Sequence, residues 1–200
     1  MGSAAADRGR VVRQKLLGAA VELIPERGWA GVSTRVLAER AGVNPSVVHY
    51  HFSSLRELMN EAVAGLMRRG MAEFESAFDE TAPPAEAVRT MFASVEGYTG
   101  DDPTSLVFVE AYLAATRDEE LRERIRGEIE GFSHRLSALL ARNGVPAPEV
   151  TAAVLGGALD GLLLHRGLGA GQDTEQIVEV LRRLVDRAGA PARGALPDNP

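Results

Sequence analysis

Residues 33–52 read STRVLAERAGVNPSVVHYHF, a stretch with two helix starts and one glycine turn. Ser33 is a favourable N-cap, because a serine side-chain oxygen accepts a hydrogen bond from the free amides of a first helical turn. The sequence therefore predicts a short helix over about 34–41. Gly42 follows this helix and tolerates the backbone angle of a tight turn.

A second helix start comes directly after this turn. Asn44 is a cap for free amides and Pro45 is preorganised for the first helical position, so a helix is expected over about 45–51. A longer helix over about 9–27 precedes both, because apolar residues recur there at three- and four-residue steps. These proportions are typical of a helix-turn-helix unit. A tight corner in any helical bundle also favours Ala and Gly, so the spacing leaves that alternative open.

The rest of the chain has helical periodicity and no convincing strand alternation. It predicts six further helices, at about 54–80, 85–99, 104–116, 118–142, 148–168 and 173–188. The expected fold class is all-α, with an N-terminal three-helix helix-turn-helix domain followed by a six-helix domain. The expected boundaries are 1–53 for the first domain, 54–188 for the second with 54–80 as a connecting helix, and 189–200 for a mobile tail.

Charge is distributed unevenly along the 200 residues. Residues 1–60 contain eight Lys or Arg and five Asp or Glu, which gives a charge of +3. Because the whole chain has a charge of −6, the other 140 residues carry −9. A basic head on an acidic body fits a protein that meets phosphates at one end. The chain has no cysteine and no apolar stretch as long as a membrane span, so we expect a cytoplasmic protein without a membrane partner.

Residues 33–45 and 48–52 resemble the N-terminal signature of the TetR family of bacterial transcriptional regulators. The resemblance implies a three-helix DNA-binding domain, a connecting helix, and a divergent C-terminal domain that forms a homodimer and binds effectors. It also implies a phosphate-binding lysine at the position of Leu55, where only the neighbouring Arg56 is basic here.

The helix over 45–51 divides its side chains between core and solvent. Val48 and Phe52 are four residues apart and are expected to face the core. The polar and small residues left over are candidates for base edges and phosphates, and Arg35 in the first turn of the preceding helix is placed to hold a phosphate. The predicted DNA-binding residues are Ser33, Thr34, Arg35, Asn44, Pro45, Ser46, Val47, His49, Tyr50 and Arg56.

Other basic residues near this unit have two interpretations. Arg8, Arg10 and Arg13 either form a flexible arm that enters a minor groove or belong to a solvated face. For His51, packing is favoured over chemistry, and His49 and His51 diverge on a helix, which makes them poor metal partners.

A second set of residues suggests a ligand cavity. The helix over 104–116 is apolar around its circumference except for Glu110 and the Tyr112 hydroxyl, so it should be central. A carboxylate there must be paired or hydrogen-bonded. Glu110 is either tied to an arginine or a helix end, or contacts a polar ligand group. The predicted ligand-binding residues are Phe92, Val95, Phe108, Glu110 and Tyr112; an interior without a cavity near them would favour a protein without an effector.

The last two long helices suggest a two-fold homodimer. The segment 150–168 is apolar on nearly every side and needs cover from more than one neighbour, while 173–188 carries a single apolar stripe. The predicted interface residues are Gly157, Gly161, Leu164, Ile177, Leu181 and Leu184.

These features favour a ligand-responsive DNA-binding transcriptional regulator, expected to repress and to leave a palindromic operator when a small-molecule effector binds. A constitutive DNA-binding protein without an effector is the main alternative, and a helical-bundle enzyme or metal protein is the third. No catalytic residue, metal ligand or cofactor is predicted, because no phosphate loop and no histidine pair with metal spacing is present.

Overall fold

The computed structural model describes residues 3–76, 83–171 and 173–186, in which nine α-helices and one 3₁₀ helix occur and no strand. The expected all-α class is confirmed. The tail at 189–200, predicted to be mobile, lies outside the described residues. The helices are α1 Ser3–Arg27, η1 Trp29–Gly31, α2 Thr34–Ala41, α3 Pro45–His51, α4 Leu55–Ser76, α5 Pro84–Ala93, α6 Pro103–Ala115, α7 Glu119–Arg142, α8 Pro148–Gly167 and α9 Thr174–Val185.

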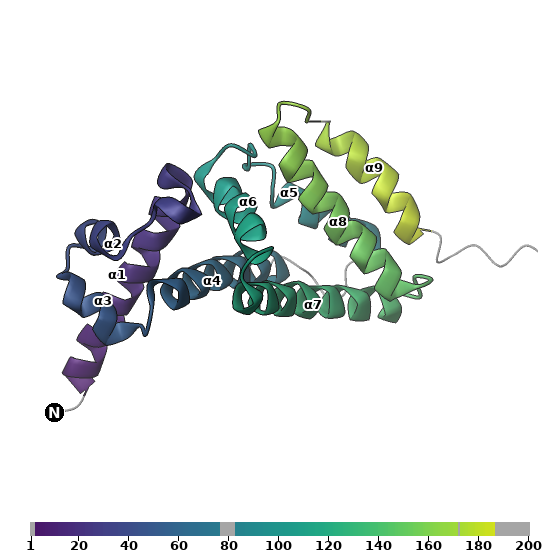
Figure 1. The fold of residues 1–200 in the computed structure, drawn as a ribbon. Coiled ribbons are helices and arrows are strands. Elements are labelled where there is room, and N and C mark those ends of the chain that lie inside the picture. Colours follow the sequence, from purple (N-terminus) through teal and green to yellow (C-terminus); the bar gives the residue numbers. More distant parts are fainter. Residues whose placement is uncertain (1–2, 77–82, 172, 187–200) are drawn as a thin grey trace, which may run out of the picture.

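The molecule is elongated, with α1, α2 and α3 gathered at one end and α8 and α9 side by side at the other (Figure 1). The connecting helix α4 leads from the first group into the second and packs against both α1 and α7. Helix α6 lies between the two ends and packs against α1, α7 and α8. Contact with the end formed by α1 to α3 is therefore made by α4 and α6 together.

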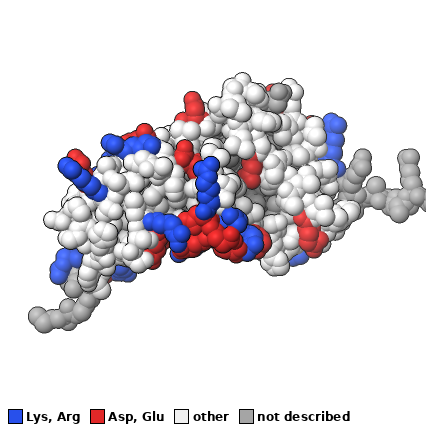
Figure 2. All heavy atoms as spheres, in the orientation of Figure 1, with Lys and Arg blue, Asp and Glu red and all other residues white. Residues whose placement is uncertain are grey.

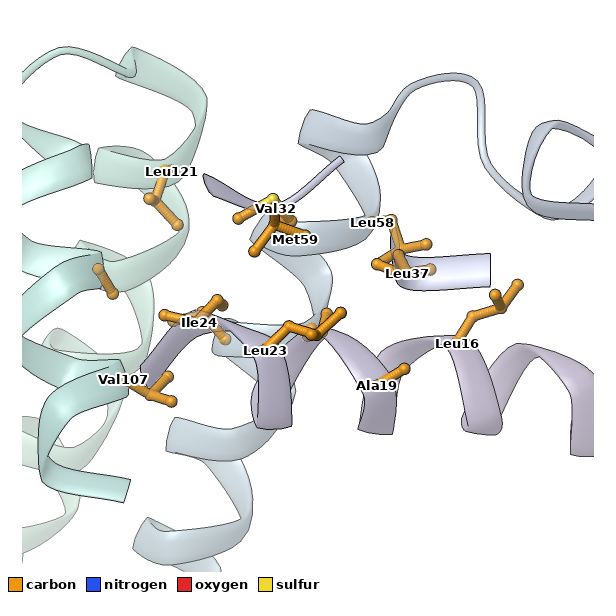
Figure 3. Close-up of a cluster of buried hydrophobic side chains, with 14 of the residues drawn as sticks. Leu16, Ala19, Leu23, Ile24, Val32, Leu37, Leu58, Met59, Val107 and Leu121 are labelled. Carbon is orange, nitrogen blue, oxygen red and sulfur yellow. The ribbon is translucent and has the colours of Figure 1, made fainter. Parts of the chain in front are cut away.

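One hydrophobic core joins the helix-turn-helix unit to the helices that follow (Figure 3). Full burial of one leucine stabilises the fold by about 1.5–3 kcal/mol, so a shared core links the two parts strongly. The predicted boundary at 53/54 falls inside this core and stays a prediction. The largest members of this core that have no exposed area come from α1, α2, α4, α6 and α7. They are Leu16, Leu23, Ile24, Leu37, Leu58, Val63, Val107 and Leu121.

A second core holds α5, the end of α7, α8 and α9 together. Its buried members include Met91, Phe92, Leu140, Leu155 and Val185. The chain crosses closely at one point of this region, where a Cβ on Gly100 would lie 2.1 Å from the backbone nitrogen of Gly167. Gly100 also has a φ of 88°, so no other residue fits this crossing without strain.

Two helix boundaries differ from the sequence-based expectation. Helix α1 begins at Ser3 rather than near residue 9, which makes Arg8 and Arg10 helical and rules out a flexible arm. Helix α5 ends at Ala93 rather than near residue 99, since the amides of Val95, Glu96 and Tyr98 bond to carbonyls three residues back and the chain continues as turns. The expected end of the 54–80 helix lies outside the described residues, which stop at residue 76 in this part of the chain.

Candidate functional site

The two short helices α2 and α3 have the bounds that the sequence predicts. The Ser33 hydroxyl accepts a hydrogen bond from the Val36 amide at 3.4 Å and caps α2. Gly42 takes a left-handed conformation, with φ 68° and ψ 35°, and its N–H bonds back to the Ala38 and Glu39 carbonyls. A side chain at this position would strain the turn, so the glycine sets the angle between α2 and α3.

Helix α3 begins at a cap made by Asn44, whose side-chain oxygen accepts hydrogen bonds from the amide and the hydroxyl of Ser46, both at 3.1 Å. The helix buries Val48, 1% exposed, as predicted. The opposite side presents Ser46, His49 and Tyr50 to solvent, with Tyr50 84% exposed. Pro45 is also exposed, and Thr34 and Val47 are partly exposed. An aromatic ring on a short helix is seldom so exposed to solvent, so Tyr50 is suited to contact another molecule.

The C-terminal end of α3 is fixed by contacts that the sequence did not reveal. Phe52 is buried, and the Arg13 guanidinium lies 4.6 Å from the centre of its ring. The same guanidinium forms a two-pronged ion pair with Glu61 of α4. His51 meets the Tyr50 ring edge-on at 5.1 Å and lies beside Gly9 of α1. Helices α1, α3 and α4 are thus tied together, which holds the exposed face of α3 in place.

The two arginines of α2 differ in their surroundings. Arg40 is bound by two carboxylates, Glu22 at 3.3 Å and Glu26 at 2.6 Å, and the hydrogen bond from Arg40 lowers the pKa of Glu26. Arg35 is exposed in the first turn and has no ion pair among the described residues. Arg35 is therefore the cation of α2 that is available to an external anion, as the sequence predicts from its position.

Arg56 has partners within the chain. Its guanidinium lies 3.7 Å from Asp118 and 3.2 Å from Glu120, at the beginning of α7. The Arg56 side chain is still 63% exposed, so the pairing is a surface one. A phosphate at this position would have to compete with two carboxylates, which weakens the expectation that Arg56 replaces the lysine implied at Leu55.

Charged side chains are distributed unevenly over the surface. Figure 2 shows acidic and basic side chains crowded over the middle of the molecule, where α4 and α7 lie, and mainly basic side chains at the end formed by α1 to α3. The exposed Arg8 and Arg10 of α1 belong to that end, although Arg10 pairs with Asp7. The end formed by α1 to α3 is thus the one suited to a polyanion.

Glu110 of α6 lies against the segment that follows α1. Its carboxylate accepts a hydrogen bond from the Trp29 amide at 2.8 Å, and both of its oxygens lie 3.8 Å from the Cβ position of Gly28. Trp29 begins η1, directly after the end of α1. Of the two interpretations of Glu110, the structure supports the one in which a helix end holds the carboxylate.

The five predicted ligand-binding residues are not brought together. Phe92 and Val95 are buried at the α5 end, and Phe108 and Glu110 pack toward α1. Tyr112 faces α8 and donates a hydrogen bond to Asp160 at 3.4 Å. Two surface hollows, of about 580 and 310 Å³, lie along α1, and none of the five residues lines them.

The predicted dimer residues divide into an exposed and a buried group. Gly157 and Leu164 of α8 are exposed, as is Leu184 of α9 at 43%, and Gly161 is partly exposed. Leu181 is only 8% exposed and Ile177 packs on the second core, because the inner half of the α9 stripe covers α5 of the same chain. The outer apolar stripe of α8 and α9 contains four of the predicted residues, Gly157, Gly161, Leu164 and Leu184, together with Val150, Val154, Leu168 and Val180.

None of the helices in the described residues is both long enough and apolar enough to span a lipid bilayer. Within the same residues, no three His, Asp or Glu side chains gather in a way that suits a metal ion.

Two family models match the chain. "Bacterial regulatory proteins, tetR family" matches residues 16–62, and "Tetracyclin repressor-like, C-terminal domain" matches residues 82–187. Among curated proteins, a helix-turn-helix-type transcriptional regulator of Mycobacterium tuberculosis is 27% identical over 160 residues, which cover 77% of this chain and 82% of that protein. The regulator BetI of Brucella anthropi is 26% identical over 164 residues, with 79% and 82% covered.

Solved structures give the same result. A transcriptional regulator from Rhodococcus sp. Rha1 superposes with a TM-score of 0.74 at 26% identity, covering 88% of this chain and 95% of that one. The multidrug binding protein EbrR, in complex with malachite green, superposes with a TM-score of 0.67 at 32% identity, covering 86% and 97%.

Proposed function

This chain belongs to the TetR family of bacterial regulatory proteins, and we propose that it binds a palindromic operator as a homodimer and is released by a small-molecule effector. The family membership makes it a helix-turn-helix transcriptional regulator with a C-terminal ligand-binding domain. The proposal extends this to the residues that touch DNA, to the dimer face and to repression as the direction of control.

The exposed side of α3 is the observation that carries the DNA-binding part. Ser46, His49 and Tyr50 face solvent while Val48 anchors the helix in the core, so the exposed groups are held on a rigid support. A helix of this kind enters a major groove, where side chains reach base edges and phosphates. Arg35 and Thr34, in the first turn of α2, supply phosphate contacts. In this proposal Ser33 and Asn44 act mainly as helix caps and Arg56 as a partner of α7.

The dimer part rests on the exposed apolar stripe of α8 and α9. Pairing of this stripe with its own copy about a two-fold axis buries side chains such as Val154, Leu164 and Val180, which water surrounds in the single chain. Apolar side chains exposed along two helices that contact each other favour association. The pairing also presents two copies of α3 to successive major grooves, about 34–36 Å apart or a little more.

The effector part is supported by the similarity to EbrR, whose structure holds malachite green. A ligand that fits only one arrangement of α4 to α8 shifts the protein toward it and moves α4, on which the spacing of the two α3 helices depends. The required difference in ligand affinity between the two arrangements is about 1–3 kcal/mol. A constitutive DNA-binding protein is the outcome if operator affinity responds to no small molecule.

Selection of bound duplexes from a random pool, followed by footprinting, tests the DNA part. The expected result is one enriched sequence with two inverted half-sites, both protected by one dimer. Enrichment of no sequence, or protection of a single half-site by a monomer, would contradict the proposal.

A further inference from the structure

Helix α3 is short and packs against few other helices. It spans Pro45–His51, about two turns, and among the described residues α2 is the helix against which it packs most. The Asn44 cap fixes its start and the buried Val48 fixes its middle. The direction in which its exposed side points therefore depends on what holds its C-terminal end.

Two carboxylates of α4 act on that end. Glu57 accepts hydrogen bonds from the hydroxyl and from the amide of Ser53, the second at 2.8 Å, and both lower the pKa of Glu57. Glu61, one turn further along α4, forms the two-pronged ion pair with Arg13, in which one nitrogen–oxygen distance is 2.5 Å. The Arg13 guanidinium in turn lies 4.6 Å from the centre of the Phe52 ring. The start of α4 thus holds two consecutive residues that follow α3.

Phe52 passes this hold on to the backbone of α3. It is the C-cap residue, its N–H donates to the Val48 carbonyl at 2.9 Å, and its side chain is buried. A cation over an aromatic face is attracted by the ring. Arg13 supplies both contacts because its planar guanidinium matches a carboxylate with its edge and an aromatic ring with its face, which a lysine does not. A displacement of Arg13 therefore displaces the end of α3.

The two kinds of DNA contact differ in how much displacement they tolerate. Contacts with base edges need their side chains held within about 0.5 Å and about 10–20° of the productive geometry. Contacts with phosphates depend on charge near a uniform backbone and carry no sequence information directly. A small shift of α3 thus costs discrimination between sequences before it costs general affinity for DNA.

We propose that Arg13 is a positioning residue for operator recognition: held by Glu61 of α4, it fixes the end of α3 through the Phe52 ring, so that α3 reads one base sequence. Arg13 itself touches no DNA in this arrangement. The proposal rests on the proposed operator binding and adds the residue that makes this binding selective. Because Glu61 belongs to α4, it also gives that helix a hold on α3 that is separate from the shared core.

The test compares two duplexes, the selected operator and a scrambled duplex of the same length and base composition. Affinity of the full-length protein for each is measured over a range of salt concentrations, for the parent, Arg13→Met and Glu61→Gln. Arg40→Met is the matched control, since Arg40 is 31% exposed against 37% for Arg13 and is also held by carboxylates, but belongs to α2.

Arg13→Met and Glu61→Gln are both expected to lose at least about fivefold in operator affinity, the discrimination that one good base contact provides. Both should keep the parental affinity for the scrambled duplex and the parental salt slope. Arg40→Met should behave like the parent on both duplexes.

Other roles of Arg13 predict different results. A direct phosphate contact would weaken binding of both duplexes and reduce the salt slope. A long-range effect of charge would make Glu61→Gln bind more tightly, since a negative charge is removed. Loss of folding would weaken binding of both duplexes in proportion to the unfolded fraction, which thermal unfolding measures. Any of these results, parental operator affinity in Arg13→Met, or an equal loss in Arg40→Met overturns the proposal.

Amide hydrogen exchange of residues 45–53 gives a readout without DNA. Exchange there is expected to be faster in Arg13→Met and Glu61→Gln than in the parent and Arg40→Met, while exchange in α8 stays parental. Parental exchange of residues 45–53 in Arg13→Met overturns the proposal. If exchange changes as expected but the parent selects no operator, the hold of Arg13 on α3 stands and the proposed function is contradicted.

Discussion

The backbone N–H of Trp29 donates a hydrogen bond of 2.8 Å to the Glu110 carboxylate, which is 81 residues away along the chain. Trp29 follows the end of α1, and Glu110 is in the middle of α6. The bond thus joins the helix-turn-helix end to the central helix of the ligand-binding domain. In the proposed regulation, a ligand that displaces α6 would act on α1 through this contact and through the shared core.

Replacement of Glu110 by Ala is expected to lower the free energy of unfolding by about 1–2 kcal/mol, because the partly buried Trp29 amide loses its acceptor. Glu110→Gln keeps an acceptor oxygen and should cost less. Urea unfolding measures both, with Glu96→Ala, an exposed carboxylate on the segment before α6, as the control. If Glu110→Ala and Glu96→Ala have equal effects, the bond does not join the two parts.

If the proposed dimer forms, Leu164→Glu is expected to convert it into a monomer at micromolar concentration, because the substitution places one charge from each subunit on the proposed shared face. Ile129→Glu is the control, since Ile129 is 37% exposed on α7 and lies outside the stripe. Light scattering gives the mass of each. A dimeric Leu164→Glu, or a parent that is already monomeric, contradicts the assigned interface.

Asp102 gives an expected pH dependence of stability. Its carboxylate accepts hydrogen bonds from the Thr99, Thr104 and Ser105 amides at 2.9, 3.0 and 3.0 Å and caps α6. Burial opposes ionisation, but the hydrogen bonds from Ser105, Gly100 and Thr99 outweigh it and lower the pKa of Asp102. The stabilisation is therefore fully present above the ordinary pKa of an aspartate and disappears as the pH falls through the lowered value.

Asp102→Asn is expected to unfold more easily than the parent at pH 7, by about 1–3 kcal/mol, and the difference should shrink below about pH 4. Asp101→Asn, on the neighbouring exposed residue, is the control. Thermal unfolding between pH 2.5 and 7 measures the difference. A gap between Asp102→Asn and the parent that does not change with pH would show that the charge of Asp102 is not what stabilises α6.

Asn60 is fully buried in α4, and neither polar atom of its side chain has a hydrogen-bond partner among the described residues. Leucine has the same branching without polar atoms, so Asn60→Leu is expected to raise the free energy of unfolding by about 1–3 kcal/mol. Asn60→Asp, which adds a buried charge, should lower it by more. Chemical unfolding distinguishes the two, and destabilisation by both substitutions would mean that the amide is satisfied in solution.

The sequence predicted local features well and distant pairings poorly. Ser33, Gly42, Asn44 and Pro45 act on their own turns, so the bounds of α2 and α3 were correct. The partner of Glu110 comes from a distant segment, and no pattern along the chain contains it. The same limit explains Arg56, whose acidic partners at the start of α7 are visible only once α4 and α7 are placed together.

Amphipathic patterns also do not say which neighbour covers an apolar stripe. Ile177, Leu181 and Leu184 form one stripe on α9, yet its inner part covers α5 and only its outer part is free. Asn60 was missed for a related reason, because a polar residue on an amphipathic helix is normally read as exposed. Phe92 and Glu110 were both predicted to bind ligand, because Phe92 lines one apolar helix and Glu110 interrupts another. The fold places the two residues in different parts of the molecule.

The most direct test of the DNA-binding face compares two arginines of the same short helix. Arg35 is exposed and has no ion pair among the described residues, whereas Arg40 is held by Glu22 and Glu26. Affinity for the selected operator is measured by fluorescence anisotropy over a range of salt concentrations. Arg35→Ala is expected to weaken binding at every salt concentration and to reduce the salt slope by about two per dimer, one phosphate contact for each subunit. Arg40→Ala should leave the slope unchanged; a parental slope in Arg35→Ala, or equal losses in both variants, would contradict the assigned DNA-binding face.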